Sequence, residues 1–263
     1  MKEVGALGQE SAESADLNEE THEESGEEQK TAKRSLREAV IEYIKRYFLL
    51  IVGLFILAFG VAFSIKAGLG TSPISSVPYV LNLITGLSVG TTTIIVNAVI
   101  VLLQIVILRR KYQPIQLLQF PVAVVFGLLT DVAVACLDGI ILTAYWQQWL
   151  MCIAGIALVG LAVSFEVAAH AVTLPGEGLA LALCRVIKLK FGYMKVIVDV
   201  SFVIIAVALS FGFLHGLQGV REGTLAAAIF VGLLAKQINR LSVPLAQKWI
   251  EGNSCGQEGN RTE

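Results

Sequence analysis

Long apolar segments separated by short polar ones run through this chain from residue 47 to residue 238. A transmembrane helix rises about 1.5 Å per residue and needs about 20 apolar residues. Five segments have 19–21 residues, namely Tyr47–Ile65, Gly90–Leu108, Leu117–Leu137, Trp149–Val167 and Val196–Leu214, and a sixth, Thr224–Ile238, has 15. The pattern therefore predicts an all-α integral membrane protein with six transmembrane helices.

Two further apolar segments are only about a dozen residues long, which is too short to cross a bilayer. Each follows an interruption rich in glycine and proline, which allow tight turns and close backbone approach. The residues concerned are Gly68, Gly70, Pro73, Pro175, Gly176 and Gly178. Proline suits the first turn of a helix, and Ser72 stands where it can cap the first of the two. We expect each short segment to be a re-entrant or half-membrane helix.

The two interruptions lie 102 residues apart, and the similarity extends on both sides of them. Aligned pairs include Pro73 with Pro175, Gly90 with Gly192 and Asn97 with Asp199. A unit with an odd number of spans has opposite orientations in its two copies. We therefore expect two inverted three-helix repeats, residues 47–138 and 139–240, each with one short helix.

The flanks differ sharply in charge from the apolar part. Residues 1–32 hold ten acidic and two basic side chains without apolar periodicity, which is typical of a disordered tail. Of the formal net charge of −1, this acidic tail therefore contributes −8 and the rest of the chain +7. Residues 33–46 are basic and amphipathic, which predicts a juxtamembrane helix on an anionic leaflet. Residues 241–263 are expected to form a polar cytoplasmic tail.

The distribution of basic residues predicts the orientation. In the six-span arrangement, residues 33–46, 109–111 and 185–195 and the C-terminal flank lie on one side, and the opposite loops hold only Lys66 and Arg221. Basic loops stay in the cytoplasm, so both termini are expected there. Eight spans would move residues 109–111 outside, which argues against that arrangement.

Three motifs carry a resemblance to a known family. They are AGLGTSP at residues 67–73, PGEGL at 175–179 and VREGT at 220–224. In this order and spacing they resemble the YczE/YyaS/YitT-like family of bacterial multi-pass membrane proteins, over residues 45–240. The resemblance implies a membrane fold in the bacterial cytoplasmic (inner) membrane. Because most members have no established substrate or activity, it implies no catalytic residue.

Polar side chains within apolar segments are costly, so each is a candidate for function. The candidates are Asn97, Asp131, Glu166, His170, Glu177, Asp199 and His215. Glu166 and His170 lie one helical turn apart, where they can relay protons or satisfy each other. Asp199 can pair with Lys195 one turn earlier, and Asp131 and His215 lie near span ends, where an interfacial role is expected.

The two short helices make a joint case for a binding site. A half-helix that begins inside the membrane directs its free N–H groups at the interior, which suits an anionic ligand or a carboxylate. Ser75 aligns with Glu177 in the repeat, so Ser72, Ser75 and Glu177 are expected to face one polar cavity, with Glu166 and His170 along the same route. In the alternative interpretation, Glu177 only stabilises its helix end and the interruptions are surface loops.

Several functions lack support in the sequence. There is no P-loop, HExxH or GxSxG motif and no CxxC pair, so we expect no enzyme activity, cofactor, metal site or disulfide. Positive-inside topology explains the basic residues without nucleic acid. The expected partners are the lipid bilayer and a small molecule or ion, and the Gly212–Gly216 spacing is compatible with a homo-oligomer. Two functions remain: a small secondary transporter or permease with its site between the repeats, or a non-transporting membrane protein that scaffolds or regulates a partner.

Overall fold

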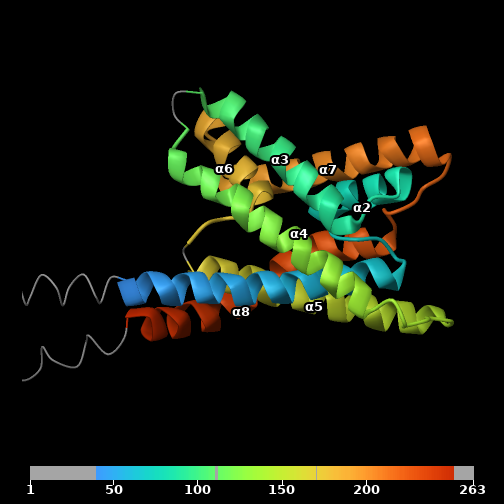
Figure 1. Ribbon diagram of the computed structural model, residues 1–263, viewed down its shortest axis with the longest axis horizontal. Coiled ribbons are helices and arrows are strands. Elements are labelled where there is room, and N and C mark those ends of the chain that lie inside the picture. The colour runs from blue at the N-terminus through green and yellow to red at the C-terminus, as the bar shows by residue number, and fades with distance from the viewer. Residues whose placement is uncertain (1–39, 110–111, 170, 252–263) are drawn as a thin grey trace, which may run out of the picture. The chain divides into compact units, whose positions relative to one another are not determined.

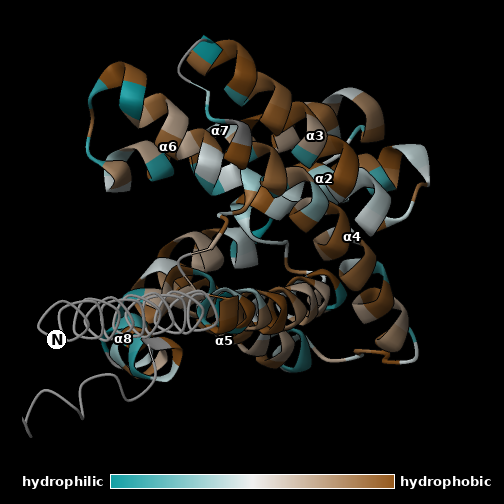
Figure 2. Cartoon of the chain, turned by 60° about the vertical axis from the view of Figure 1, so that its left-hand side comes forward, coloured by the Kyte–Doolittle hydropathy of each residue, from teal (hydrophilic) through white to brown (hydrophobic). Residues whose placement is uncertain are grey.

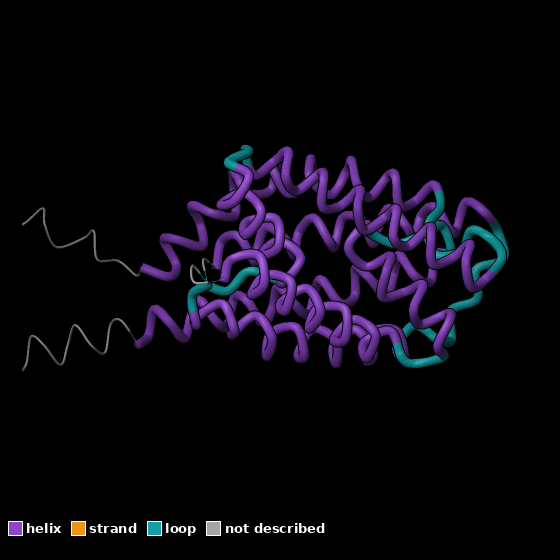
Figure 3. Tube along the Cα trace, turned by 90° about the horizontal axis from the view of Figure 1, so that it is seen from above, coloured by secondary structure: helices purple, strands orange, loops and turns teal. Residues whose placement is uncertain are grey.

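A computed structural model describes residues 40–109, 112–169 and 171–251. Every regular element among them is a helix (Figure 3), so the predicted all-helical class is confirmed. The expected disordered tail, residues 1–32, lies outside the described part of the chain. Residues 40–46 of the expected juxtamembrane helix are helical and continue without a break into the helix Val40–Ala67.

Five helical segments in the described residues are long and apolar enough to cross a membrane. They are Val40–Ala67, α3 (Val89–Leu108), Ile115–Cys136, α5 (Tyr145–Ala169) and α7 (Phe191–Leu214). The segment Ile115–Cys136 comprises most of a 3-10 helix η2 (Pro114–Leu118) and α4 (Gln119–Cys136). Figure 2 shows these helices coloured mainly as hydrophobic. The count becomes six if the two bent parts of α8 (Glu222–Glu251) form one span.

Many large apolar side chains point outward from these helices. Leu102 on α3 is 61% exposed and Ile204 on α7 is 62% exposed. Exposed apolar surface on this scale is costly in water, and it is the surface that lipid tails cover. Together with the lengths of the helices, it indicates a multi-pass membrane protein.

The last helix runs farther than the sequence predicts. The expected polar tail from residue 241 begins inside α8, which bends by 49° between Glu222–Arg240 and Ser242–Ile250 and ends at Glu251. Pro244 lies in the first turn of the second part, where its missing N–H costs no helical hydrogen bond. The ring of Trp249 lies 6.4 Å from that of Phe48, centroid to centroid. The end of α8 therefore packs beside the start of the first span.

The two short helices are present, and their bounds repeat. The first, α2 (Pro73–Thr85), and the second, α6 (Pro175–Ile187), each have 13 residues, or about 20 Å of helix, which is short of a bilayer core. They begin at the aligned prolines, 102 residues apart. Likewise α3 and α7 begin at residues 89 and 191, and the helices before the interruptions end at residues 67 and 169.

From residue 46 onward the helices form two layers (Figure 1). One layer contains the helix that ends at Ala67 together with α5 and α8, and the other contains α2, α3, α6 and α7, with α4 crossing in front of them. The packing exchanges partners between the two halves of the sequence. The short helix α2 packs on α7, and α6 packs on α3. Each short helix is thus held by a long helix from the other half.

Paired glycines bring the long helices into close contact. A Cβ atom added to Gly155 of α5 would lie 2.9 Å from the carbonyl oxygen of Gly60, and one added to Gly127 of α4 would lie 2.7 Å from that of Gly90 in α3. No larger side chain fits at these crossings without moving a backbone. Small residues at helix crossings are the usual means of close packing in membranes.

Candidate functional site

The first turns of α2 and α6 meet. A Cβ atom added to Gly176 would lie 2.8 Å from Cγ1 of Ile74 and closer still to its Cδ1. Ile74 and Gly176 are each the second residue of their helix. From this meeting point α6 and α2 extend toward opposite sides of the view in Figure 1. The N-terminal ends of the two short helices therefore converge on one place.

A cavity of about 360 Å³ lies at this meeting point. Both first turns line it, together with residues from α3, α4, α5, α7, α8 and the helix that ends at Ala67. Six of the seven residues predicted to bind a ligand are among the lining residues: Ser72, Ser75, Asn97, Glu166, Glu177 and Asp199. The seventh, His170, lies outside the described residues. The structure thus brings the six together, and their binding of a ligand stays a prediction.

The glycines of the two interruptions have different roles. Gly68 and Gly70 have φ angles of +69° and +96°, which only glycine adopts readily, so they form the expected tight turn. Gly176 and Gly178 instead lie within α6, where they allow close packing. A Cβ atom on Gly178 would lie 2.7 Å from the side-chain amide nitrogen of Gln119.

The side chain of Ser72 does not cap α2, although the residue occupies the N-cap position. Its hydroxyl donates instead to the Ser75 hydroxyl, at 3.1 Å. The expected capping bond, in which the Ser72 hydroxyl would accept from a backbone N–H, is therefore absent, and the Ser75 N–H donates to the Ser72 carbonyl oxygen instead, at 3.0 Å. Both hydroxyls remain at the cavity wall, where they can donate to or accept from a ligand.

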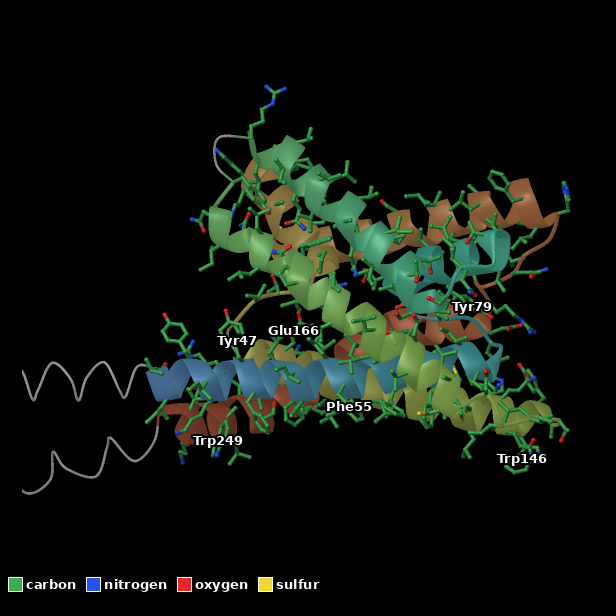
Figure 4. All side chains as sticks on the ribbon, viewed as in Figure 1. Tyr47, Phe55, Tyr79, Trp146, Glu166 and Trp249 are labelled. Carbon is green, nitrogen blue, oxygen red and sulfur yellow. The ribbon has the colours of Figure 1, made fainter. Side chains whose placement is uncertain are left out.

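Glu166 is buried, with 8% of its surface exposed, and it lines the cavity from α5. Figure 4 shows it on the side of its layer that faces α4. Its Oε1 accepts a hydrogen bond from the backbone N–H of Leu174 at 2.7 Å. This bond positions the residue that immediately precedes α6. The proton relay with His170 stays a prediction.

Glu177 is half-buried in the first turn of α6. Within the described residues, its carboxylate makes neither a hydrogen bond nor an ion pair. Asp199 differs, because its Oδ1 lies 2.9 Å from the Lys195 ammonium nitrogen, as the sequence predicts. Both members of this pair line the cavity. The cavity thus contains three carboxylates and one ammonium group.

The remaining polar candidates lie away from the cavity. Asp131 on α4 accepts hydrogen bonds from the Ser88 hydroxyl, at 2.7 Å, and from the Gly90 N–H, at 2.6 Å. It therefore satisfies the start of α3 from a neighbouring helix. His215 follows the last residue of α7, with a φ angle of +52°. At the start of α8, Arg221 and Glu222 form a local ion pair at 3.4 Å.

Two glutamines that the sequence analysis missed support the site. Gln104 of α3 is 1% exposed, and its Nε2 donates to Gln119 Oε1 of α4 at 3.1 Å and to the Pro175 carbonyl at 2.9 Å. Gln104 thus holds the first residue of α6 directly, and Gln119 accepts a second hydrogen bond from the same amide nitrogen. The signal was available, because both are polar residues in or beside an apolar segment, which is the criterion that selected the acids.

The loop before α2 is tied to the start of α8. The N–H of Gly223 donates to the Leu69 carbonyl at 2.8 Å, and the Arg221 guanidinium donates to the Gly68 carbonyl at 3.1 Å. The N–H of Thr71 donates to the Gly219 carbonyl at 3.4 Å. We call these three bonds the loop–α8 contact. They hold the loop between the first span and α2 against the residues at the start of α8.

This architecture defines an all-helical, multi-pass membrane protein with two short helices that converge on an internal cavity. The chain belongs to the family of unknown function DUF6198, whose model matches residues 44–240. No curated protein and no solved structure matches it.

Proposed function

We propose that the protein is a small secondary transporter or permease that carries its substrate through the cavity where α2 and α6 meet. The observation that supports this most directly is the contact between Ile74 and Gly176, which brings two half-helix N-termini to one cavity. Transporters built from repeats bind substrate at such places, because broken helices present unpaired backbone groups to the interior.

The proposal includes an inverted relationship between residues 47–138 and 139–240. The repeated helix bounds support it, as does the exchange of packing partners, α2 on α7 and α6 on α3. Two structurally similar halves facing each other can rock about a shared site, which exposes the site to each side of the membrane in turn.

The conformation described here fits a state that is closed on one side. The loop–α8 contact would seal the side where the first span ends. On the other side, the cavity reaches Phe191 and Gly192 in the first turn of α7, next to the basic loop that contains Lys188 and Lys190. Under the positive-inside rule, this second side is the cytoplasm. The substrate would then enter or leave through the start of α7.

The proposal sets the protein in the cytoplasmic membrane of a bacterium, with both termini in the cytoplasm. The rings of Phe48 and Trp249 lie side by side, near the start of the first span and the end of α8. The basic residues close to them in the sequence support this orientation. It also retains the resemblance to YczE/YyaS/YitT-like proteins and assigns no enzyme activity to the chain.

Flux in sealed vesicles tests the proposal. The full chain is reconstituted, and uptake and efflux of a broad panel of small metabolites are compared with those of empty vesicles and of vesicles with Glu177→Gln. Saturable flux that the substitution abolishes would support the transporter. A folded, inserted protein that moves no solute faster than empty vesicles would contradict it and favour a scaffold or regulator.

A further inference from the structure

We propose that the cavity binds a small organic ammonium ion with a compact apolar body. This inference rests on the proposed function, because it assigns a substrate class to the same cavity. Three features carry it: the balance of charges in the cavity wall, the carboxylate that already stands at the α6 terminus, and the apolar remainder of the lining.

The cavity wall contains more acidic than basic side chains. Lys195 pairs with Asp199 at 2.9 Å, and it is the only positive side chain among the described residues that line the cavity. Glu166 and Glu177 lie in the same wall, and Glu177 makes no hydrogen bond or ion pair within the described residues. A carboxylate that faces an internal cavity without a partner gains most from a cation, because attraction between charges is strong where water is scarce.

The half-helix ends do not reverse this preference. A helix N-terminus attracts negative charge, and that of α6 already has Glu177 in its first turn. The first turn of α2 has no acidic residue, and it presents Ser72 and Ser75 instead. An anion bound there would face the two glutamates across the same cavity, whereas a cation would meet hydroxyl oxygens that can accept its hydrogen bonds.

The remaining lining favours an organic cation over a bare metal ion. Within the described residues, no three His, Cys, Asp or Glu side chains come together as metal ligands. Most of the wall consists of apolar side chains, among them Leu57, Val159 and Val231, and two phenylalanines, Phe126 and Phe191. Phenylalanine faces attract ammonium groups. The volume of about 360 Å³ is at the lower end for ligand pockets, so the body must be small.

Binding of three aromatic probes with the same ring and different charge tests the inference. The full chain in lipid nanodiscs is titrated with benzylamine, benzyl alcohol and benzoate, and empty nanodiscs are subtracted. Benzylamine is expected to bind saturably and more tightly than the other two. Glu177→Gln should weaken benzylamine by at least about tenfold, because it removes the unpaired carboxylate.

Two further variants distinguish an effect of charge on binding from a loss of binding through misfolding. Lys195→Gln should tighten benzylamine binding, because it removes the only positive group of the described lining; misfolding could not produce that change. Asp138→Asn removes an exposed carboxylate that pairs with Lys66 and does not line the cavity, and it should leave binding unchanged. Thermal unfolding of each variant in nanodiscs verifies that it is folded.

Three outcomes would overturn the inference. They are benzoate or benzyl alcohol binding as tightly as benzylamine, equal affinity of benzylamine for the original protein and Glu177→Gln, and no saturable binding of benzylamine. The proposed function fails separately. Ammonium binding without flux in vesicles would contradict the transporter proposal and support the ligand class. Flux of anions alone would support the transporter proposal and contradict the ligand class.

Discussion

The side chain of Ile74 lies against the backbone of Gly176, so closely that residue 176 has no room for a side chain. Gly176→Ala should therefore force the Ile74 side chain to shift, which disturbs the contact between the first turns of α2 and α6. Overpacking of this kind costs about 1–3 kcal/mol. Unfolding in a detergent titration measures the loss. Gly212→Ala is the control, because a Cβ atom there has no neighbour within 4 Å, and equal stability of the two variants would contradict the packing.

The loop–α8 contact provides a second test. Gly70→Ala adds a Cβ atom 2.7 Å from the Arg221 backbone nitrogen, whereas Gly86→Ala adds one in open space; both glycines have positive φ angles. The strain of φ is common to both substitutions, at roughly 1 kcal/mol. Gly70→Ala should destabilise the protein further, and it should open the loop to a membrane-impermeant thiol reagent through a cysteine at Thr71. If both variants behave alike, the contact does not close that side.

Gln104→Leu should destabilise the start of α6. The substitution leaves the Pro175 carbonyl and the Gln119 amide without their donor, and hydrogen bonds between membrane helices contribute about 0.6–2 kcal/mol. Gln237→Leu is a matched control, because Gln237 is exposed on α8. Detergent-induced unfolding of the two variants gives the comparison, and a Gln104→Leu protein as stable as the control would remove the supporting role of Gln104.

Labelling of single cysteines tests the topology. In a background without the four native cysteines, substitutions at the exposed residues Gln113 and Gln218 should react with an impermeant reagent from opposite sides of the membrane. The expectation follows from the spans between them and from the basic residues next to Gln113. Labelling of both from one side would rule out the six-span orientation.

Glu177→Gln distinguishes a ligand-binding carboxylate from one that stabilises its helix. If Glu177 only interacts with the α6 dipole, the substitution should cost about 0.3–1 kcal/mol and leave flux unchanged. If it binds substrate, flux should be lost while the unfolding transition moves little. Asp138→Asn is the control for removing a carboxylate elsewhere. Unchanged flux in Glu177→Gln would leave only the stabilising role.

Much of this arrangement could be predicted because membranes impose strict requirements. Segment length separated α2 and α6 from the spanning helices, and the cost of buried polar groups identified Glu166 and Asp199 as candidates. The repeat indicated that Ser75 and Glu177 belong together, and both line one cavity.

Other features depend on packing that a single segment does not reveal. The polar composition after residue 240 suggests a tail, yet α8 continues through Pro244, because a proline in the first turn of the second part loses no hydrogen bond. Gly176 and Gly178 suggest a turn, but their function is to admit Ile74 and Gln119. The polar side chain of Gln104 within an apolar segment was a signal, but its partner is a carbonyl 71 residues away, which the segment itself does not reveal.

The exchange of packing partners between α2 and α7, and between α6 and α3, has a consequence for biosynthesis. While the first half emerges from the ribosome, α2 is made more than 100 residues before the helix on which it rests is complete. A chain stopped after residue 138 would hold a short helix that packs on α3 but lacks α7, the long helix of the other half that it also contacts. The two halves should therefore mature together, and fragments 1–138 and 139–263 made in one cell should rescue each other, although neither would be stable alone.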